Sequence, residues 1–196
     1  SKLIGASVSP GTSVQDIGRF GAQRYGLVPS GAVDRLAMAA ANALLGNPLF
    51  AATLELGPLN SVFTAKGGAV RVALSGALRP ADIAGSPVAV NTTVTLADGE
   101  SLNIGVARSG TFGYLAIEGG VRGEPMFGSL AVNARAGLGS PYPRPLQAGD
   151  ELLVATASAM TEKRIELPAP VEGPIRVVLG PQDDEFAEGK DLFLNS

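Results

Sequence analysis

The stretch Val94-Thr95-Leu96-Ala97-Asp98-Gly99-Glu100-Ser101-Leu102-Asn103-Ile104 decides the fold class of this chain. Apolar residues alternate with polar ones on both sides of an Asp-Gly pair, and this pair is a strong signal for a tight turn between antiparallel strands. The stretch therefore predicts a β-hairpin with its turn at residues 98–99.

The same alternation recurs along most of the sequence, whereas only one segment has helical spacing. We expect further strands at residues 70–74, 102–106, 114–117, 151–154 and 175–179. Apolar residues at positions 36, 37, 40, 41, 44 and 45 predict one helix over about residues 32–45, capped by Ser30 and ended by Gly46. Closely spaced strands with a single helix predict a mainly β fold, a barrel or a sandwich, rather than a βαβ nucleotide fold.

The composition supports a globular chain and excludes several functional classes. Of the 196 residues, 45% are hydrophobic, and 26 glycines with 14 prolines fit many turns. Without cysteine or histidine there is no disulfide, thiol nucleophile, serine–histidine dyad or ordinary zinc site, so we expect no bound metal. A net charge of −3 without a basic cluster argues against nucleic acid or a membrane as partner. No apolar run approaches a membrane span and no signal peptide is visible, so we expect a cytoplasmic protein.

A change in composition divides the chain near its C-terminal end. Residues 157–174 are rich in small, charged and proline residues, which is typical of a linker. A new strand is expected from Ile175, and the residues after it are too few for an independent domain. We therefore expect one subdomain over residues 1–168 and, over residues 169–196, a linker and the beginning of a second, truncated subdomain.

The densest polar constellation lies within residues 12–34. Glycines at positions 18, 21, 26 and 31 mark an irregular loop that can approach a ligand or a partner closely. Gln15, Asp16 and Arg19 supply an amide, a carboxylate and a guanidinium, which suit the binding of a planar amide or ureido group. The alternative is structural: Asp16 forms an Asx turn onto the backbone near Gly18 and pairs with Arg19.

Further polar groups lie at the start of the helix and beyond it. Asp34 can act as a base or acceptor beside an anion at the helix N-terminus, or it can serve only the helix itself, as a capping residue that also complements the dipole. Asn42 stands among alanines, an unfavourable place unless its amide is used, and we expect it to bond a neighbouring loop. Glu55 is a lone acid between strand residues, for which a buried salt bridge is the structural alternative.

Several of these segments resemble one known family. The pieces are residues 12–21, 30–34 and 41–47, the run Tyr114-Leu115-Ala116-Ile117-Glu118-Gly119-Gly120-Val121, and Arg144-Pro145-Leu146 leading to Gly149-Asp150. Together they resemble the allophanate hydrolase subunit 2 family, which includes the KipA proteins, the C subunit of bacterial 5-oxoprolinase and the carboxyltransferase region of urea carboxylase. Residues 175–186 resemble the family's entry into a second subdomain. The sequence departs from the pattern at Leu130, where the family usually carries arginine, and the family continues beyond Ser196, so the chain resembles its N-terminal part.

The resemblance implies a cyclophilin-like β-barrel type of architecture and a KipI-like partner, allophanate hydrolase subunit 1. It implies a subunit of an ATP-dependent hydrolase that opens a cyclic amide, similar to the C subunit of 5-oxoprolinase, with ATP bound through the complex and not by a motif in this chain. The alternatives are a biotin-dependent carboxyltransferase acting on urea or a similar amide, and a non-catalytic KipA-like antagonist of a kinase inhibitor. We expect the chain alone to be inactive. The candidate catalytic residues are Asp34 and Asp16, and the candidate substrate-binding residues are Gln15, Arg19, Ser30, Gly31 and Asn42.

Overall fold

The computed structural model describes residues 1–158 and 161–168, together with the single positions 173, 174, 178, 180, 181, 185, 188 and 191. The chain divides into two units, Ser1–Glu166 and Leu167–Ser196. The strand expected at residues 175–179 and the second subdomain expected over residues 169–196 lie outside the described residues, apart from those single positions.

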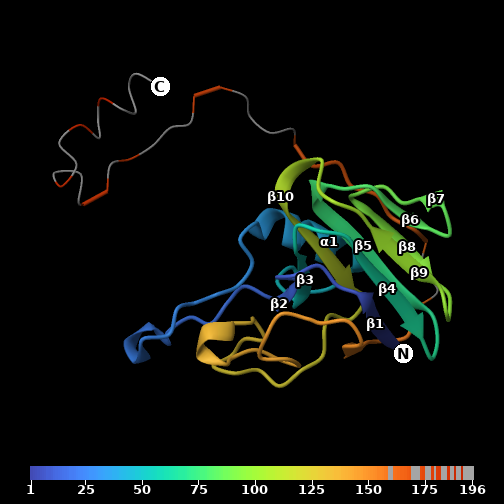
Figure 1. Ribbon diagram of the computed structural model, residues 1–196, viewed down its shortest axis with the longest axis horizontal. Coiled ribbons are helices and arrows are strands. Elements are labelled where there is room, and N and C mark those ends of the chain that lie inside the picture. Colours follow the sequence, from blue (N-terminus) through green and yellow to red (C-terminus); the bar gives the residue numbers. More distant parts are fainter. Residues whose placement is uncertain are drawn as a thin grey trace. The chain divides into compact units, whose positions relative to one another are not determined.

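Two antiparallel sheets and one α-helix make up the described part of the first unit (Figure 1). The six-stranded sheet has the order β11-β1-β4-β9-β6-β7, with the bounds Glu151–Leu153, Lys2–Ser7, Ser61–Lys66, Ser101–Ile104, Ala81–Ile83 and Ser86–Pro87. The five-stranded sheet has the order β2-β3-β10-β5-β8, with the bounds Ser13–Gln15, Thr53–Leu56, Ser109–Ile117, Val70–Leu78 and Thr92–Leu96. Helix α1 spans Arg35–Leu45, and two 3-10 turns span Gln23–Tyr25 (η1) and Ala134–Ala136 (η2). The expectation of a mainly β fold with one substantial helix is confirmed, and none of the described helices is both long and apolar enough to cross a membrane.

The main core lies between the two sheets. Alternate side chains of each strand point to the same face, and the facing sides are aliphatic apart from Phe63. Fully burying each of these side chains contributes about 1.5–3 kcal/mol. The residues that form it include Leu3, Phe63 and Leu102 from the six-stranded sheet and Leu54, Val72, Leu74 and Leu115 from the five-stranded sheet.

Helix α1 covers the other face of the five-stranded sheet, where it packs on β5 and β10 (Figure 1). The alternation in β5 is typical of a strand with one buried face, but β5 is buried on both faces, because Val70, Val72 and Leu74 face the other sheet while Ala73 faces the helix. The small side chains of Ala73 and Ala116 on this face let the helix approach closely, and Tyr114 packs in the same cluster. The apolar stripe of the helix is also shifted from the expected one, because Met38 is buried whereas Leu36 is 60% exposed.

The helix ends where the sequence predicts and begins three residues later. Gly46 adopts φ +70°, and its N–H closes onto the carbonyl groups of Asn42 and Ala43, so glycine is favoured at this left-handed position. The expected cap, Ser30, is wrong: Asp34 is the N-cap, and its side chain accepts a hydrogen bond from the N–H of Ala37 at 2.9 Å. Asn, Asp and Ser are about equally good caps, so composition did not distinguish the two positions.

The Asp98-Gly99 turn forms, but the hairpin expected around it does not. Asp98 accepts a hydrogen bond from the N–H of Gly67, and the N–H of Glu100 closes the turn onto Ala97. Strand β8 then pairs with β5, whereas β9 pairs with β4 and β6. The turn therefore carries the chain from one sheet to the other, since each strand buries its apolar face by pairing with residues distant in the sequence.

Candidate functional site

The two ends of the loop over residues 16–34 are joined by backbone hydrogen bonds between residues 16–19 and residues 29–32. The N–H of Arg19 donates to the carbonyl of Pro29 at 2.8 Å, and the N–H of Ala32 donates to that of Asp16 at 2.9 Å. Between these bonds Gly18 and Gly31 face each other with φ +100° and +92°. A Cβ atom added to Gly31 would lie 2.7 Å from the backbone of residues 17 and 18, so glycine is required for this close approach.

Gln15 connects three segments through its buried amide. Its Nε2 donates to the hydroxyl of Ser13 at 3.0 Å and to the carbonyl of Val132 at 3.3 Å, while its Oε1 accepts the N–H of Gly31 at 3.1 Å. Two of the expected substrate-binding residues, Gln15 and Gly31, are thus brought together. In this conformation both ends of the amide are occupied by the protein itself.

Asp16 is 8% exposed and accepts three hydrogen bonds. Its Oδ1 accepts the N–H of Gly18 at 2.8 Å and the hydroxyl of Ser129 at 2.6 Å, and its Oδ2 accepts the N–H of Leu130 at 2.7 Å. The Asx turn onto Gly18, which was the structural alternative, is present. The carboxylate also joins the opening loop to a segment more than a hundred residues further along the chain.

Arg19 is fully buried, with only one of its three guanidinium nitrogens bonded. Its Nη2 donates to the carbonyl of Ala131, whereas Nε and Nη1 have no hydrogen-bond partner among the described residues. Desolvation lowers the pKa of Arg19, and the negative charge of Asp16 opposes this shift. The expected direct pairing with Asp16 is replaced by the bond to Ala131, so both side chains fasten the loop to residues 129–131.

Asp34 belongs to a second network, at the start of α1. Its N–H donates to the hydroxyl of Tyr114 at 2.8 Å, and that hydroxyl donates to Oε2 of Glu55 at 2.6 Å. The same Oε2 accepts the N–H of Val33 at 3.0 Å. Tyr114 is fully buried, and desolvation, reinforced by the bond to Glu55, raises the pKa of its hydroxyl far above the ordinary value. Tyr114 therefore stays protonated and works as a fixed link between β10, β3 and the helix start.

Sequence reasoning missed part of this network. Glu55 stood out as a lone acid, but its partners are a hydroxyl and an N–H rather than the buried salt bridge considered for it. Apart from its place in a family piece, the only signal for Tyr114 is a phenol directly before three aliphatic residues. Asp34 itself is exposed, and no bond between described residues joins it to Gln15, Asp16 or Arg19.

The remaining expected residues are Asn42 and Ser30. Asn42 is fully buried and donates to the carbonyl groups of Leu49 and Ala51 at 3.2 and 2.8 Å, so the expectation that it bonds a neighbouring loop is confirmed. Ser30 is partly exposed with φ +56°. Within the described part of the chain, no three acidic side chains gather closely enough to hold a metal ion.

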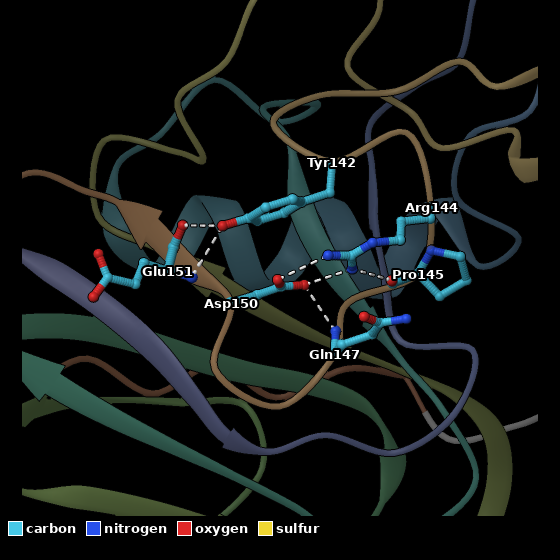
Figure 2. Close-up of polar contacts among 6 residues, drawn as sticks. All are labelled: Tyr142, Arg144, Pro145, Gln147, Asp150 and Glu151. Carbon is cyan, nitrogen blue, oxygen red and sulfur yellow. Dashed lines mark hydrogen bonds and ion pairs between the residues drawn. The ribbon is translucent and has the colours of Figure 1, made fainter.

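A further polar group, which the sequence indicated only as a family piece, shapes the loop before β11. Figure 2 shows the guanidinium of Arg144 directed at the carboxylate of Asp150, with bonds of 2.7 and 2.9 Å, while that carboxylate also accepts the N–H of Gln147. The bond to Arg144 is the main cause that lowers the pKa of Asp150. The hydroxyl of Tyr142 is bonded to the backbone of Glu151. All these atoms lie within residues 142–151, from the loop to the first residue of β11, so the bonds are local and indicate a structural role.

The outer side of the opening loop is aromatic. Phe20, Arg24 and Tyr25 line a hollow of about 450 Å³ together with Phe127. In Figure 1 the blue segment that carries η1 and the yellow-orange segment that carries η2 both lie on the side of β2. The loop therefore has a buried side that anchors it and an exposed side that faces outward.

Residues 25–196 match the family described as carboxyltransferase domain, subdomain A and B. The chain is similar to the C subunit of 5-oxoprolinase from Haemophilus influenzae, with 30% identity over 181 residues, or 92% of this chain and 58% of the relative. It is 32% identical to the C subunit of 5-oxoprolinase from Escherichia coli over 189 residues, or 94% of this chain and 60% of the relative. Urea amidolyase of Lachancea kluyveri is 34% identical over 149 residues, or 74% of this chain and 8% of the relative. The chain thus spans about three fifths of the length of the two 5-oxoprolinase relatives.

Solved structures give the same result. The crystal structure of TTHA0988 superposes with a TM-score of 0.82 and 29% identity, over 93% of this chain and 68% of that one. Urea carboxylase of Kluyveromyces lactis superposes with a TM-score of 0.75 and 28% identity, over 86% of this chain and 15% of that one. Sequence and fold agree that the chain belongs to the carboxyltransferase domain family, subdomains A and B.

Proposed function

We propose that this chain is part of the C subunit of a 5-oxoprolinase, which opens a cyclic amide together with a KipI-like partner. The observation that carries the proposal is the similarity to two proteins of that name over 92% and 94% of the chain. In the proposed reaction water adds across the ring C–N bond of 5-oxoproline and yields glutamate, coupled to the hydrolysis of ATP to ADP and phosphate.

The described residues supply a positioning surface more readily than a complete set of catalytic groups. The carboxylate of Asp16 and the amide of Gln15 are buried and fully engaged, so chemistry on a substrate would require them to leave their present partners. Asp34 is exposed at the positive end of α1, a position that suits binding of a carbonyl or carboxylate oxygen. Asp34 is therefore the better candidate for an acid–base or positioning role.

The nucleotide is assigned to the complex rather than to this chain. Gly119 and Gly120 lie one residue beyond the end of β10 and form a turn in which the N–H of Gly120 closes onto the carbonyl of Ile117. A phosphate-binding loop leads from a strand into a helix, whereas no helix follows this turn before η2. The glycine pair therefore does not form a phosphate-binding loop for ATP.

The test is reconstitution with the KipI-like partner. The protein is co-expressed with that partner and purified, and ADP release is measured with and without 5-oxoproline, with each protein alone as a control. The proposal predicts release that depends on 5-oxoproline and on both proteins. A stable complex with no turnover of any small amide would instead support a regulatory, KipA-like role.

A second candidate is a biotin-dependent carboxyltransferase acting on urea or a similar amide. The family description and the similarity to urea amidolyase and urea carboxylase favour it. The same preparation, supplied with a carboxylated biotin carrier, would carboxylate urea in this case. Carboxylation without 5-oxoproline-dependent ADP release would decide for the second candidate.

A further inference from the structure

Three exposed aromatic side chains gather on one face of a chain that has only seven phenylalanines and three tyrosines. Phe20, Tyr25 and Phe127 are 56%, 64% and 55% exposed, and the rings of Tyr25 and Phe127 lie 6.4 Å apart. Two of them come from the opening loop and the third from a segment about a hundred residues away. Single exposed apolar residues are ordinary, but a cluster around a hollow marks an interaction site.

Two arginines complete this face, which we call the aromatic loop face and define as Phe20, Arg24, Tyr25, Arg35 and Phe127. The guanidinium of Arg24 lies 4.8 Å from the Tyr25 ring centroid, and that of Arg35 lies 5.9 Å from the Phe20 centroid. Neither arginine forms an ion pair within the described residues. Of the five residues that define the face, Arg24 and Arg35 are cations and none is an acid, whereas the chain as a whole carries −3. The face is therefore basic and apolar on an acidic protein.

The face is held in shape before any partner arrives. The N–H groups of Tyr25 and Gly26 close η1 onto the carbonyl groups of Ala22 and Gln23 at 2.9 and 2.8 Å. Phe127 has φ +53°, a conformation that bulky residues rarely adopt and that costs about 1–3 kcal/mol. The neighbouring Ser129 is bonded to Asp16, so both segments of the face share one buried anchor. A preorganised surface loses little conformational entropy on binding.

We propose that the aromatic loop face docks the KipI-like partner, through an apolar segment that is flanked by Asp or Glu side chains. The identity of the partner rests on the proposed function. Aromatic and arginine side chains dominate the binding energy of protein interfaces, and the two arginines complement carboxylates on the other side. Nucleic acid fits poorly, because strand binding needs a positively charged groove along several phosphates, and this face offers two cations.

The test measures the affinity of the full chain for the KipI-like partner by isothermal titration calorimetry at low and high salt. The double variant Phe20→Ala/Tyr25→Ala should weaken binding by roughly 30-fold or more. Arg24→Glu should weaken it by about tenfold at low salt and reduce the salt dependence. Phe50→Ala and Arg108→Glu are the matched controls, since both residues are exposed and lie outside the face; they should bind as the wild type does. Thermal unfolding of every variant confirms that it folds.

Each outcome has a distinct meaning. If the wild type binds and turns over substrate while the face variants bind equally well, the docking face is refuted and the proposed function stands. Equal weakening by the control variants would also refute a specific face. If the wild-type chain does not bind the partner, both the docking face and the proposed complex fail. Flotation of the wild type with vesicles containing about 30% phosphatidylserine, lost in the face variants, would replace a protein partner by a membrane surface.

Discussion

Replacement of Asp16 by alanine removes the acceptor of three buried hydrogen bonds, from the N–H groups of Gly18 and Leu130 and from the hydroxyl of Ser129. A hydrogen bond to a charged group contributes about 1.5–3 kcal/mol, and a buried donor left without a partner costs about 1–3 kcal/mol. The three effects overlap, because the donors share one carboxylate. We expect Asp16→Ala to lower the free energy of unfolding by about 3–5 kcal/mol, a large part of the roughly 5–15 kcal/mol typical of a domain.

Asp16→Asn separates the hydrogen bonds from the charge. The amide can keep an oxygen at Oδ1 for Gly18 and Ser129, but its NH₂ group then meets the N–H of Leu130. The expected loss is about 1.5–3 kcal/mol, between wild type and alanine. Urea unfolding followed by circular dichroism measures these differences, and the m-values should stay unchanged.

Two results would contradict this reasoning about Asp16. A loss below about 1 kcal/mol in Asp16→Ala would show that the carboxylate does not anchor the loop. Full stability of Asp16→Asn, combined with loss of turnover in the reconstituted complex, would instead restore Asp16 as a catalytic residue.

Three further predictions concern Asp34, Arg79 and Asp150. Asp34→Asn keeps a good helix cap, so it should change the free energy of unfolding by only a few tenths of a kcal/mol, but it should cut turnover of the complex by roughly 100-fold if the carboxylate acts in the reaction. Asp34→Ala also removes the cap and should lower the free energy of unfolding by about 1 kcal/mol. Unchanged turnover in both variants would leave capping as the only role of Asp34. Arg79 is 3% exposed, and its Nε and Nη2 have no partner among the described residues. Arg79→Met should therefore raise the free energy of unfolding, measured by thermal or urea denaturation, by about 1–3 kcal/mol. A lower free energy of unfolding in this variant would show that the guanidinium is paired in solution. The pKa of Asp150 is lowered in the folded state, chiefly by its bond to Arg144, so the ionised carboxylate stabilises the fold fully above about pH 4, and this contribution is lost as the pH falls through the lowered pKa. The difference in free energy of unfolding between wild type and Asp150→Asn should therefore shrink only in that acid range. A constant difference down to about pH 2 would contradict the ion pair.

The fold was predictable from the sequence wherever local chemistry decides it. The helix stop at Gly46 depends on one left-handed position, and the turn at Asp98-Gly99 depends on the preferences of two residues. The pairing of the strands around that turn was not predictable, because β8 and β9 obtain their partners from β5 and β4. Which sheet a strand joins is determined by apolar faces that meet only after the chain has folded.

The candidate site was likewise predictable only in part, because its composition is local whereas its contacts join residues distant in the sequence. The sequence identified Gln15, Asp16 and Arg19 as an unusual polar group, and the structure brings their side chains to one segment, residues 129–132. It could not show that these side chains are buried, since polar residues at a ligand site and polar residues anchoring a loop have the same composition. Tyr114 was missed because its role depends on Glu55 and on the N–H of Asp34, which are distant in sequence.

The order of strands in the six-stranded sheet has a consequence for the synthesis of the protein. Strand β1 lies between β4 and β11, with Lys2 opposite Leu153. At about 5–20 residues per second, β11 leaves the ribosome on the order of ten seconds after β4. During that interval β1 presents an open edge, which can pair with the same strand of a neighbouring nascent chain. Slower translation would lengthen this exposure, and a chain that ends before Glu151 would keep the edge open permanently, so truncation at that point should favour aggregation over folding.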